Sequence, residues 1–147
     1  MRDDPRVSDP LTLRIRNSVD AIAPANAAAT TWLEANRVPP AATVLASLAI
    51  EELVTNCIKY GYSDSNEHLI DVALVVADGQ LVMHVTDDGR PFNPLEAPVP
   101  DLSLPLEERP IGGLGLHLLR TMSDSMTYER RGNLNCITLV KAMIDVP

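Results

Sequence analysis

The stretch Leu45–Tyr62 reads LASLAIEELVTNCIKYGY, and its spacing predicts one long helix around which the rest of the chain is organised. At about 100° per residue, Glu51 and Lys59 lie on a narrow ridge that faces solvent. Glu52 and Asn56 are four residues apart, so they stack on another side of the helix, among apolar neighbours. Such polar groups cost free energy unless protein, water or a ligand satisfies them. The alternative is that both lie at the helix border and contact solvent.

The composition is that of one soluble domain of 147 residues, with 46% hydrophobic and 22% charged residues. The net charge of -8 argues against a nucleic-acid-binding surface, but it does not exclude a nucleotide pocket. From the sequence we expect that no apolar run reaches the ~18 residues that span a membrane, and the N-terminus lacks the apolar core of a signal peptide. Cys57 and Cys136 resemble buried thiols in a reducing cytosol. We therefore expect a cytoplasmic protein without nucleic-acid or membrane partners.

The first third of the chain predicts a strand followed by two helices. Residues 1–10 are polar and contain proline, so we expect them to be flexible. The segment Leu11–Arg16 alternates apolar and polar residues, which is typical of a half-buried strand. An alanine-rich helix follows to about Arg37, with Pro24 in its first turn, and Pro40 opens the central helix.

Two pairs of strands are expected in the remainder. The runs Leu69–Ala77 and Leu81–Thr86 are joined by Asp78-Gly79, which is a strong hairpin signal. The runs Ser125–Arg131 and Asn135–Met143 are joined by a turn at Gly132-Asn133. The hairpins predict an antiparallel sheet.

Between these pairs lies a segment with the composition of a lid. Residues 91–110 hold six of the twelve prolines, a density that no helix or central strand tolerates. A loop of this length in a compact domain is usually a lid or binding loop, here over residues 90–111, and a helix follows to about Met122. The order of elements predicts an α+β fold, a two-layer sandwich with helices packed on one face of a largely antiparallel mixed sheet. We expect residues 1–147 to form one domain.

Three separated motifs carry the chemistry. The first is Glu52 with Asn56, the second is Asp87-x-Gly89 at the end of a hydrophobic strand, and the third is a run of glycines at a helix start, Gly112-Gly113-x-Gly115. Glycines there let backbone N–H groups approach an anion. An asparagine oxygen suits Mg²⁺, and a nearby glutamate can accept a proton from a hydroxyl. Each motif alone is commonly a turn or a loop, whereas their combination in this order is more specific.

The motifs together resemble the GHKL-type ATP-binding domain, the Bergerat fold of gyrase and histidine kinases. Within that group the chain most resembles the stand-alone anti-sigma-factor serine/threonine kinases of bacterial partner-switching systems. The resemblance extends from Leu11 to about Met143. The segment EELVTNCIKYGY is similar to the N box, VTDDGRPFNP to the first glycine box and IGGLGLHLL to the second. The closing NCITLVKAM resembles the terminal strand.

The resemblance implies roles for individual residues. Asn56 would coordinate a Mg²⁺ ion that bridges the phosphates of ATP, and Glu52 would be the general base that activates a substrate hydroxyl. Asp87 would bind the adenine amino group, and Gly89 would let the base approach the backbone. The stretch implied to line the phosphates beneath the lid comprises Gly112, Gly113, Leu114, Gly115 and Leu116.

Several positions leave alternatives open. Lys59 matches a phosphate-contacting lysine of histidine kinases, or it is a solvated surface residue. Arg109 could reach the γ-phosphate, although a free surface arginine is the simpler interpretation, and His117 is most simply a packing or surface residue. The first glycine box departs from the family at Pro91, where a second glycine is usual.

The final strand departs from the family as well. It often carries a threonine near the base, whereas here the nearest residue is Asn135 or Cys136, with Thr138 further along. The resemblance therefore leaves this contact with the base unassigned.

Two functions follow from the resemblance. The first is a Mg-ATP-dependent kinase that phosphorylates a small antagonist protein and sequesters a sigma factor or similar target. The second is a module that binds ATP and a partner without kinase activity. Glu52 favours the kinase, because a pure binding module needs no base there. A detached histidine-kinase catalytic domain is disfavoured, and a homodimer is plausible by resemblance only.

Overall fold

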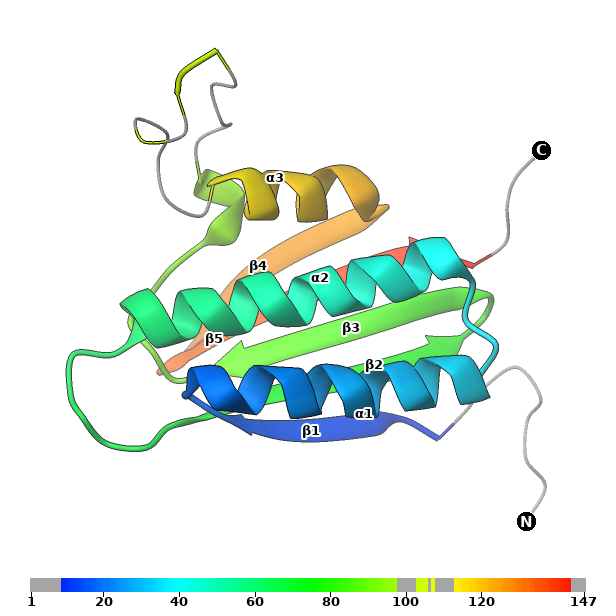
Figure 1. The fold of residues 1–147 in the computed structure, drawn as a ribbon, viewed down its shortest axis with the longest axis horizontal. Coiled ribbons are helices and arrows are strands. Elements are labelled where there is room, and N and C mark those ends of the chain that lie inside the picture. Colours follow the sequence, from blue (N-terminus) through cyan, green and yellow to red (C-terminus); the bar gives the residue numbers. More distant parts are fainter. Residues whose placement is uncertain (1–8, 98–102, 106, 108–112, 144–147) are drawn as a thin grey trace.

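The computed structural model describes residues 9–97, 103–105, 107 and 113–143. In this part of the chain, helices cover one face of a five-stranded sheet (Figure 1). The helices and strands are β1 (Leu11–Arg16), α1 (Ile22–Ala35), α2 (Pro40–Asn56), the π-helix η2 (Cys57–Gly61), β2 (Leu69–Ala77), β3 (Gln80–Asp87), α3 (Gly113–Met122), β4 (Ser125–Arg131) and β5 (Leu134–Ala142), with short 3-10 turns η1 (Val19–Ala21) and η3 (Pro94–Glu96).

The expected α+β fold is confirmed. The strand order is β1-β2-β3-β5-β4, and each of the four described pairings is antiparallel. The β2–β3 hairpin turns at Asp78 and Gly79, whose φ angles are 54° and 75°. Two consecutive positive φ angles match the right-handed twist of the flanking strands, which explains the choice of Asp-Gly at this turn.

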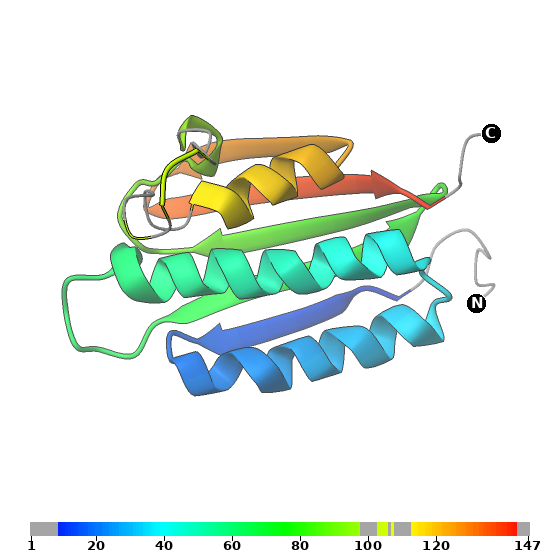
Figure 2. The same cartoon turned by 45° about the horizontal axis from the view of Figure 1, so that its top comes forward.

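Helix α2 lies between α1 and α3, and the three helices run side by side over the sheet (Figures 1 and 2). Its buried residues face the core: Ala42, Leu45, Ala46, Ala49, Ile50, Leu53 and Val54. Beneath them lie the apolar residues of the strands, among which Ile70, Val72 and Leu74 are fully buried. Alternate residues of β2 face the other way, and within the described part of the chain the helices cover only one face of the sheet (Figure 1).

Three local expectations need correction. The central helix does not stay α-helical to Tyr62, because its last turn is the wider π-helix η2. The first helix ends at Ala35, two residues before Arg37, which adopts a left-handed φ of 55°. The proline-rich segment does contain one helical turn, η3, in which Asn93 caps the N-terminus and Pro94 occupies the first position.

One expectation about apolar length is also wrong. The helical stretch Pro40–Gly61 has 22 residues with a mean hydropathy of 1.4, and by length and composition alone it would be long enough to cross a membrane. In this fold it is the central core helix, and core helices of soluble proteins satisfy the same criterion.

We predict that α3 is held to the body of the protein by Leu119, which has no exposed surface. The change Leu119→Ala should lower the free energy of unfolding by about 2–5 kcal/mol, because it leaves a cavity in the core. Leu118 on the same helix is 39% exposed, so Leu118→Ala should cost less than about 1 kcal/mol. Urea denaturation of the three proteins measures both values. Equal losses would contradict the packing of α3 described here.

Candidate nucleotide-binding site

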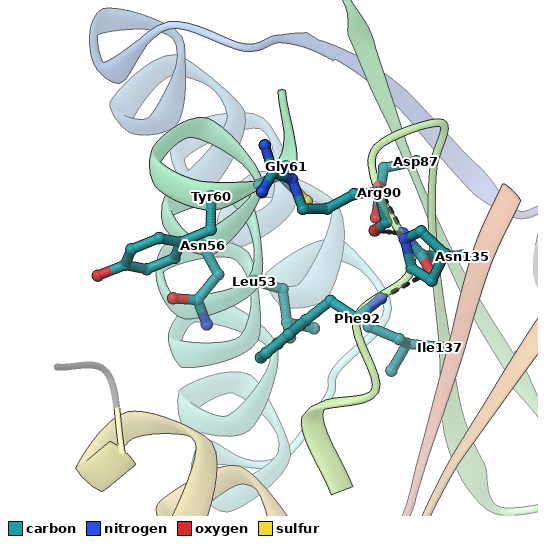
Figure 3. A pocket seen from close by; sticks show the side chains of 11 residues that line it. Leu53, Asn56, Tyr60, Gly61, Asp87, Arg90, Phe92, Asn135 and Ile137 are labelled. Atoms are coloured by element: carbon teal, nitrogen blue, oxygen red, sulfur yellow. Dashed lines mark hydrogen bonds between the residues drawn. The ribbon is translucent and has the colours of Figure 1, made fainter. Parts of the chain in front are cut away.

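A partly open pocket of about 500 Å³ lies where the end of α2 and η2 face the segment after β3. Figure 3 shows its walls. The lining residues are Leu53, Asn56, Cys57, Tyr60, Gly61, Asp87, Arg90, Pro91, Phe92, Asn135 and Ile137. The structure therefore brings Asn56 of the first motif and Asp87 of the second to one cavity, although 30 positions separate them in the sequence.

Asp87 is the buried acidic group of this pocket, with 5% of its surface exposed. Its Oδ1 accepts hydrogen bonds from the backbone N–H of Gly89 at 2.9 Å and from Nδ2 of Asn135 at 3.0 Å. The Cys57 thiol also hydrogen-bonds to Asp87, and burial followed by the charge of Asp87 raises the pKa of this thiol. Donors of this kind compensate a buried carboxylate for its lost hydration. A group that only accepts hydrogen bonds is thus placed at the edge of the pocket.

Gly89 lies at a close contact between two backbone segments. A Cβ atom at this position would lie 2.9 Å from the carbonyl oxygen of Gly61 and 2.9 Å from Oδ1 of Asp87. The next residue, Arg90, donates its backbone N–H to the same Gly61 oxygen at 2.9 Å. The π-turn of η2 thus meets the segment after β3 directly, and only glycine fits at residue 89 without a shift of the backbone.

Glu52 and Asn56 lie at the pocket end of α2, as the helical spacing predicted. Asn56 lines the pocket, and its Nδ2 atom is buried with no hydrogen-bond partner among the described residues. Burial raises the pKa of Glu52, the negative charge of Glu51 adds to this effect, and Lys59 opposes it. An unsatisfied buried donor and a partly desolvated carboxylate on one helix are typical of a site that serves a ligand.

The start of α3 reaches Glu52. A Cβ atom on Gly115 would lie 2.1 Å from the carboxylate carbon and from Oε2 of Glu52, so a side chain there would force the Glu52 carboxylate to move. Residues of the first and third sequence motifs are therefore in contact. The Glu52 carboxylate lies against the first turn of α3, which is a ten-residue helix. Exposed N–H groups in such a turn attract negative charge.

The remaining site candidates have different positions. Gly113 is the first residue of α3, whereas Gly112 and Arg109 lie outside the described residues. Leu114 is 45% exposed, and Leu116 is only 3% exposed because its side chain packs in the core. Any contact of Leu116 with a pocket ligand would therefore involve its backbone.

Lys59 is exposed on η2, and His117 on α3 is half-buried. Neither of them lines the pocket. Their positions leave the alternatives from the sequence open, because exposed side chains can still turn toward a bound ligand.

A second polar cluster adjoins the site, and no sequence motif predicted it. Tyr62 donates its hydroxyl to Oδ1 of Asp88 at 3.0 Å and stacks on His68 with ring centroids 3.9 Å apart. His68 lies 2.7 Å from Oδ1 of Asp64, and this hydrogen bond raises the pKa of His68. The cluster ties the loop after η2 to the residue that follows Asp87.

The helices over an antiparallel sheet, with a pocket between the central helix and the end of β3, define a histidine kinase-like ATPase domain. The model of that family matches residues 15–141, and the chain belongs to it. The chain is 27% identical over 93 residues to the serine/threonine-protein kinase BtrW of Bordetella bronchiseptica, which is 63% of this chain and 66% of that protein. It is 30% identical over 87 residues to the serine-protein kinase RsbW of Bacillus velezensis, covering 56% of this chain and 54% of that one.

Other relatives carry a different name. The anti-sigma F factor of Clostridium botulinum is 25% identical over 81 residues, which is 55% of this chain and 57% of that protein. The matched part thus spans between about half and two thirds of the length of these relatives. The crystal structure of the RsbU and RsbW domains of Rv1364c from Mycobacterium tuberculosis aligns with a TM-score of 0.67 at 19% identity, over 92% of this chain and 33% of that chain. This likeness shows the shared fold.

We predict that the environment of Glu52 reduces stability. Because burial raises the folded-state pKa of Glu52, its ionised form is less favourable in the folded than in the unfolded protein. The penalty is absent below the unfolded pKa, grows as the pH rises through the folded pKa, and is then constant. Glu52→Gln should therefore raise the free energy of unfolding at neutral pH and lose this advantage below about pH 4.

The control is Glu51→Gln on the exposed ridge of the same helix. This change removes only a repulsion on Glu52, so its gain should be smaller. Urea titrations at several pH values measure both variants. A Glu52→Gln protein that is less stable than the wild type at neutral pH would show that the carboxylate is stabilised by the fold.

Proposed function

We propose that the protein is a Mg-ATP-dependent serine/threonine kinase of a bacterial partner-switching system. It phosphorylates a small antagonist protein and sequesters a sigma factor or a similar regulatory target. The observation that carries this proposal is the Glu52 carboxylate, which lies against Gly115 in the first turn of α3 and one helical turn from Asn56 in the pocket. The names of the relatives support the same class, since they include serine kinases and an anti-sigma factor.

The adenine end of the nucleotide fits the side of the pocket at Asp87. The carboxylate is charged and only accepts hydrogen bonds, so it pairs with an exocyclic amine and repels the carbonyl of guanine. Gly61, which lines the pocket, presents only backbone to it, so no side chain from this position would obstruct a flat base. The apolar wall includes Leu53 and Ile137, which suits the faces of a purine.

The phosphate end would lie between Asn56 and the start of α3. Asn56 lines the pocket and would offer its Oδ1 to a nucleotide-bound magnesium ion, while its buried Nδ2, which has no partner among the described residues, would donate to a phosphate oxygen. Among the described residues, no group of three or more acidic, histidine or cysteine side chains is arranged to hold a metal ion, so the phosphates and water would supply most of the ligands. The ion would neutralise charge on the phosphates during transfer.

Glu52 would act on the protein substrate. Its raised pKa makes the carboxylate a better proton acceptor than an exposed glutamate. As the substrate hydroxyl oxygen bonds to the γ-phosphorus, the bond from phosphorus to the β,γ-bridging oxygen breaks and ADP departs. The hydroxyl proton moves to the Glu52 carboxylate. Positioning and charge neutralisation supply most of the rate in such transfers.

The second candidate is an ATP-binding partner-binding module without kinase activity. In that case the pocket would hold the nucleotide, and the output would depend only on the competition between partners for one surface. One relative is named an anti-sigma factor and not a kinase, which supports this second candidate. Both candidates place the protein in the cytoplasm, and a homodimer is compatible with both.

We predict that ATP binds in the pocket with millimolar affinity or better. Asp87→Asn replaces one acceptor oxygen by an NH₂ group that opposes the adenine amine, so affinity should fall at least about 100-fold. Asn56→Ala should retain weak binding but lose the gain in affinity that Mg²⁺ gives the wild type. Calorimetric titration with and without Mg²⁺ measures all three proteins. The absence of binding to well-folded wild type at millimolar ATP would remove the kinase proposal for the isolated protein.

We predict that Glu52→Gln strongly slows phosphoryl transfer without weakening ATP binding. The amide keeps the shape of the side chain but cannot accept the hydroxyl proton, so the rate should fall about 10²–10⁴-fold. The matched control is Glu51→Gln, which should retain most of the activity. The assay follows transfer of labelled γ-phosphate to candidate antagonist proteins from the same organism. Full activity in Glu52→Gln would exclude a general-base role, and ATP binding without any transfer by wild type would favour the binding module.

A further inference from the structure

Asn135 is the most fully bonded polar side chain at the pocket. It lies near the start of β5 and is 3% exposed, and the sequence left open whether this residue or Cys136 lies nearest the base. Its Nδ2 donates to Oδ1 of Asp87 at 3.0 Å and to the carbonyl oxygen of Arg90 at 2.9 Å, with a longer contact of 3.4 Å to the carbonyl of Gly89. Both amide hydrogens therefore serve the segment that follows β3.

The other end of the same amide is also occupied. Its Oδ1 accepts the hydroxyl of Tyr128 at 2.6 Å and the backbone N–H of Phe92 at 3.3 Å. A second residue of β4, Arg130, donates Nη1 to the carbonyl of Gly89 at 2.8 Å. Figure 3 shows Asn135 between Asp87 and Phe92, with dashed lines to both. The β4–β5 hairpin thus holds both ends of the segment from residue 87 to residue 92.

Only an amide can make this set of bonds. Asparagine combines two donor hydrogens with an acceptor oxygen in one plane, whereas a threonine hydroxyl has one donor and a carboxylate has none. The donor end faces a carboxylate and two carbonyls, and the acceptor end faces a hydroxyl and an N–H group. Loss of the amide would leave several of these buried groups unpaired at once.

We propose that Asn135 is a positioning residue for nucleotide recognition that couples the orientation of Asp87 to the shape of the pocket wall at Arg90 and Phe92. Because Oδ1 of Asp87 is held by Asn135 and by the N–H of Gly89, the orientation of the carboxylate is restrained, and its Oδ2 would be the oxygen that accepts from an exocyclic amine. The adenine end of the pocket is thereby formed before the nucleotide arrives, which lowers the cost of binding. This inference rests on the proposed function.

The test replaces the Asn135 amide by a carboxylate of the same shape. Asn135→Asp keeps the side-chain shape and the two acceptor bonds from Tyr128 and Phe92, but it sets a second carboxylate against Asp87. Two carboxylates within hydrogen-bonding distance share one proton, and that proton can restore the lost donor bond at low pH. We expect the dissociation constant for ATP, relative to wild type, to be raised about 30-fold or more near pH 8 and several-fold less near pH 5.5.

The quantity to compare is the dissociation constant of the variant for ATP divided by that of the wild type at the same pH. Other charged or titratable groups lie near the two carboxylates, and this ratio removes their common effect. Among the described residues these are Cys57 of η2, Asp88 and Arg90 after β3, and Tyr128 and Arg130 of β4, with His68 beyond Asp88. The matched control is Asn133→Asp in the exposed β4–β5 turn. It adds the same charge two residues away and should leave the ratio near one at every pH. Calorimetry with ATP gives all values.

A milder variant covers the case in which Asn135→Asp does not fold. Tyr128→Phe removes only the hydroxyl that donates to Oδ1 of Asn135, and it should weaken ATP binding about 2–10-fold while the apparent kcat at saturating ATP stays within about twofold. If both variants bind ATP with wild-type affinity, the positioning role of Asn135 is excluded while the proposed function stands. The same holds if the ratio of dissociation constants for Asn135→Asp does not change with pH. If the wild type itself binds no ATP, the proposed function fails and this inference fails with it.

Discussion

Burial of helix α2 is the constraint on which the rest of the structure depends. Seven of its 17 residues are buried between α1, α3 and the sheet, and three of these are alanines, which allow close approach of neighbouring helices. A helix packed in this way cannot rotate to present its polar groups to water. Glu52 and Asn56 therefore remain beside the pocket, where the carboxylate is partly desolvated and one amide atom is unpaired. The core thus pre-organises the site at some cost in stability.

The two sides of the pocket meet at bare backbone. The π-turn at the end of α2 places the Gly61 carbonyl where Arg90 can donate to it, and Gly89 has no room for a Cβ atom at the same contact. Gly115 shows the same principle at Glu52, where a side chain would occupy the position of the carboxylate. In both places, a glycine lets a functional segment approach another element more closely than side chains permit.

The sequence predicted the parts of this arrangement that depend on local patterns. Alternation in Leu69–Ala77 and the Asp78-Gly79 turn were sufficient for the β2–β3 hairpin, and prolines marked the start of α2. Separated motifs also identified Asn56 and Asp87, which the fold brings to one pocket. The π-helix and the hydrogen bonds of Asn135 were not predictable in this way, because they depend on partners from other elements that no local pattern encodes.

The pocket contains two asparagines, and their bonding distinguishes their functions. Asn135 has its amide nitrogen and its oxygen paired within the protein, so it has little capacity left for a ligand and is suited to hold Asp87 and the pocket wall in place. Asn56 keeps a buried Nδ2 without a partner among the described residues, which costs free energy unless a ligand group accepts its hydrogen bond. Of these two asparagines, Asn56 is therefore the one that a bound ligand can stabilise by a hydrogen bond. One pocket can thus use asparagine in two ways, with Asn135 as a fixed support and Asn56 as a group able to bond to a ligand.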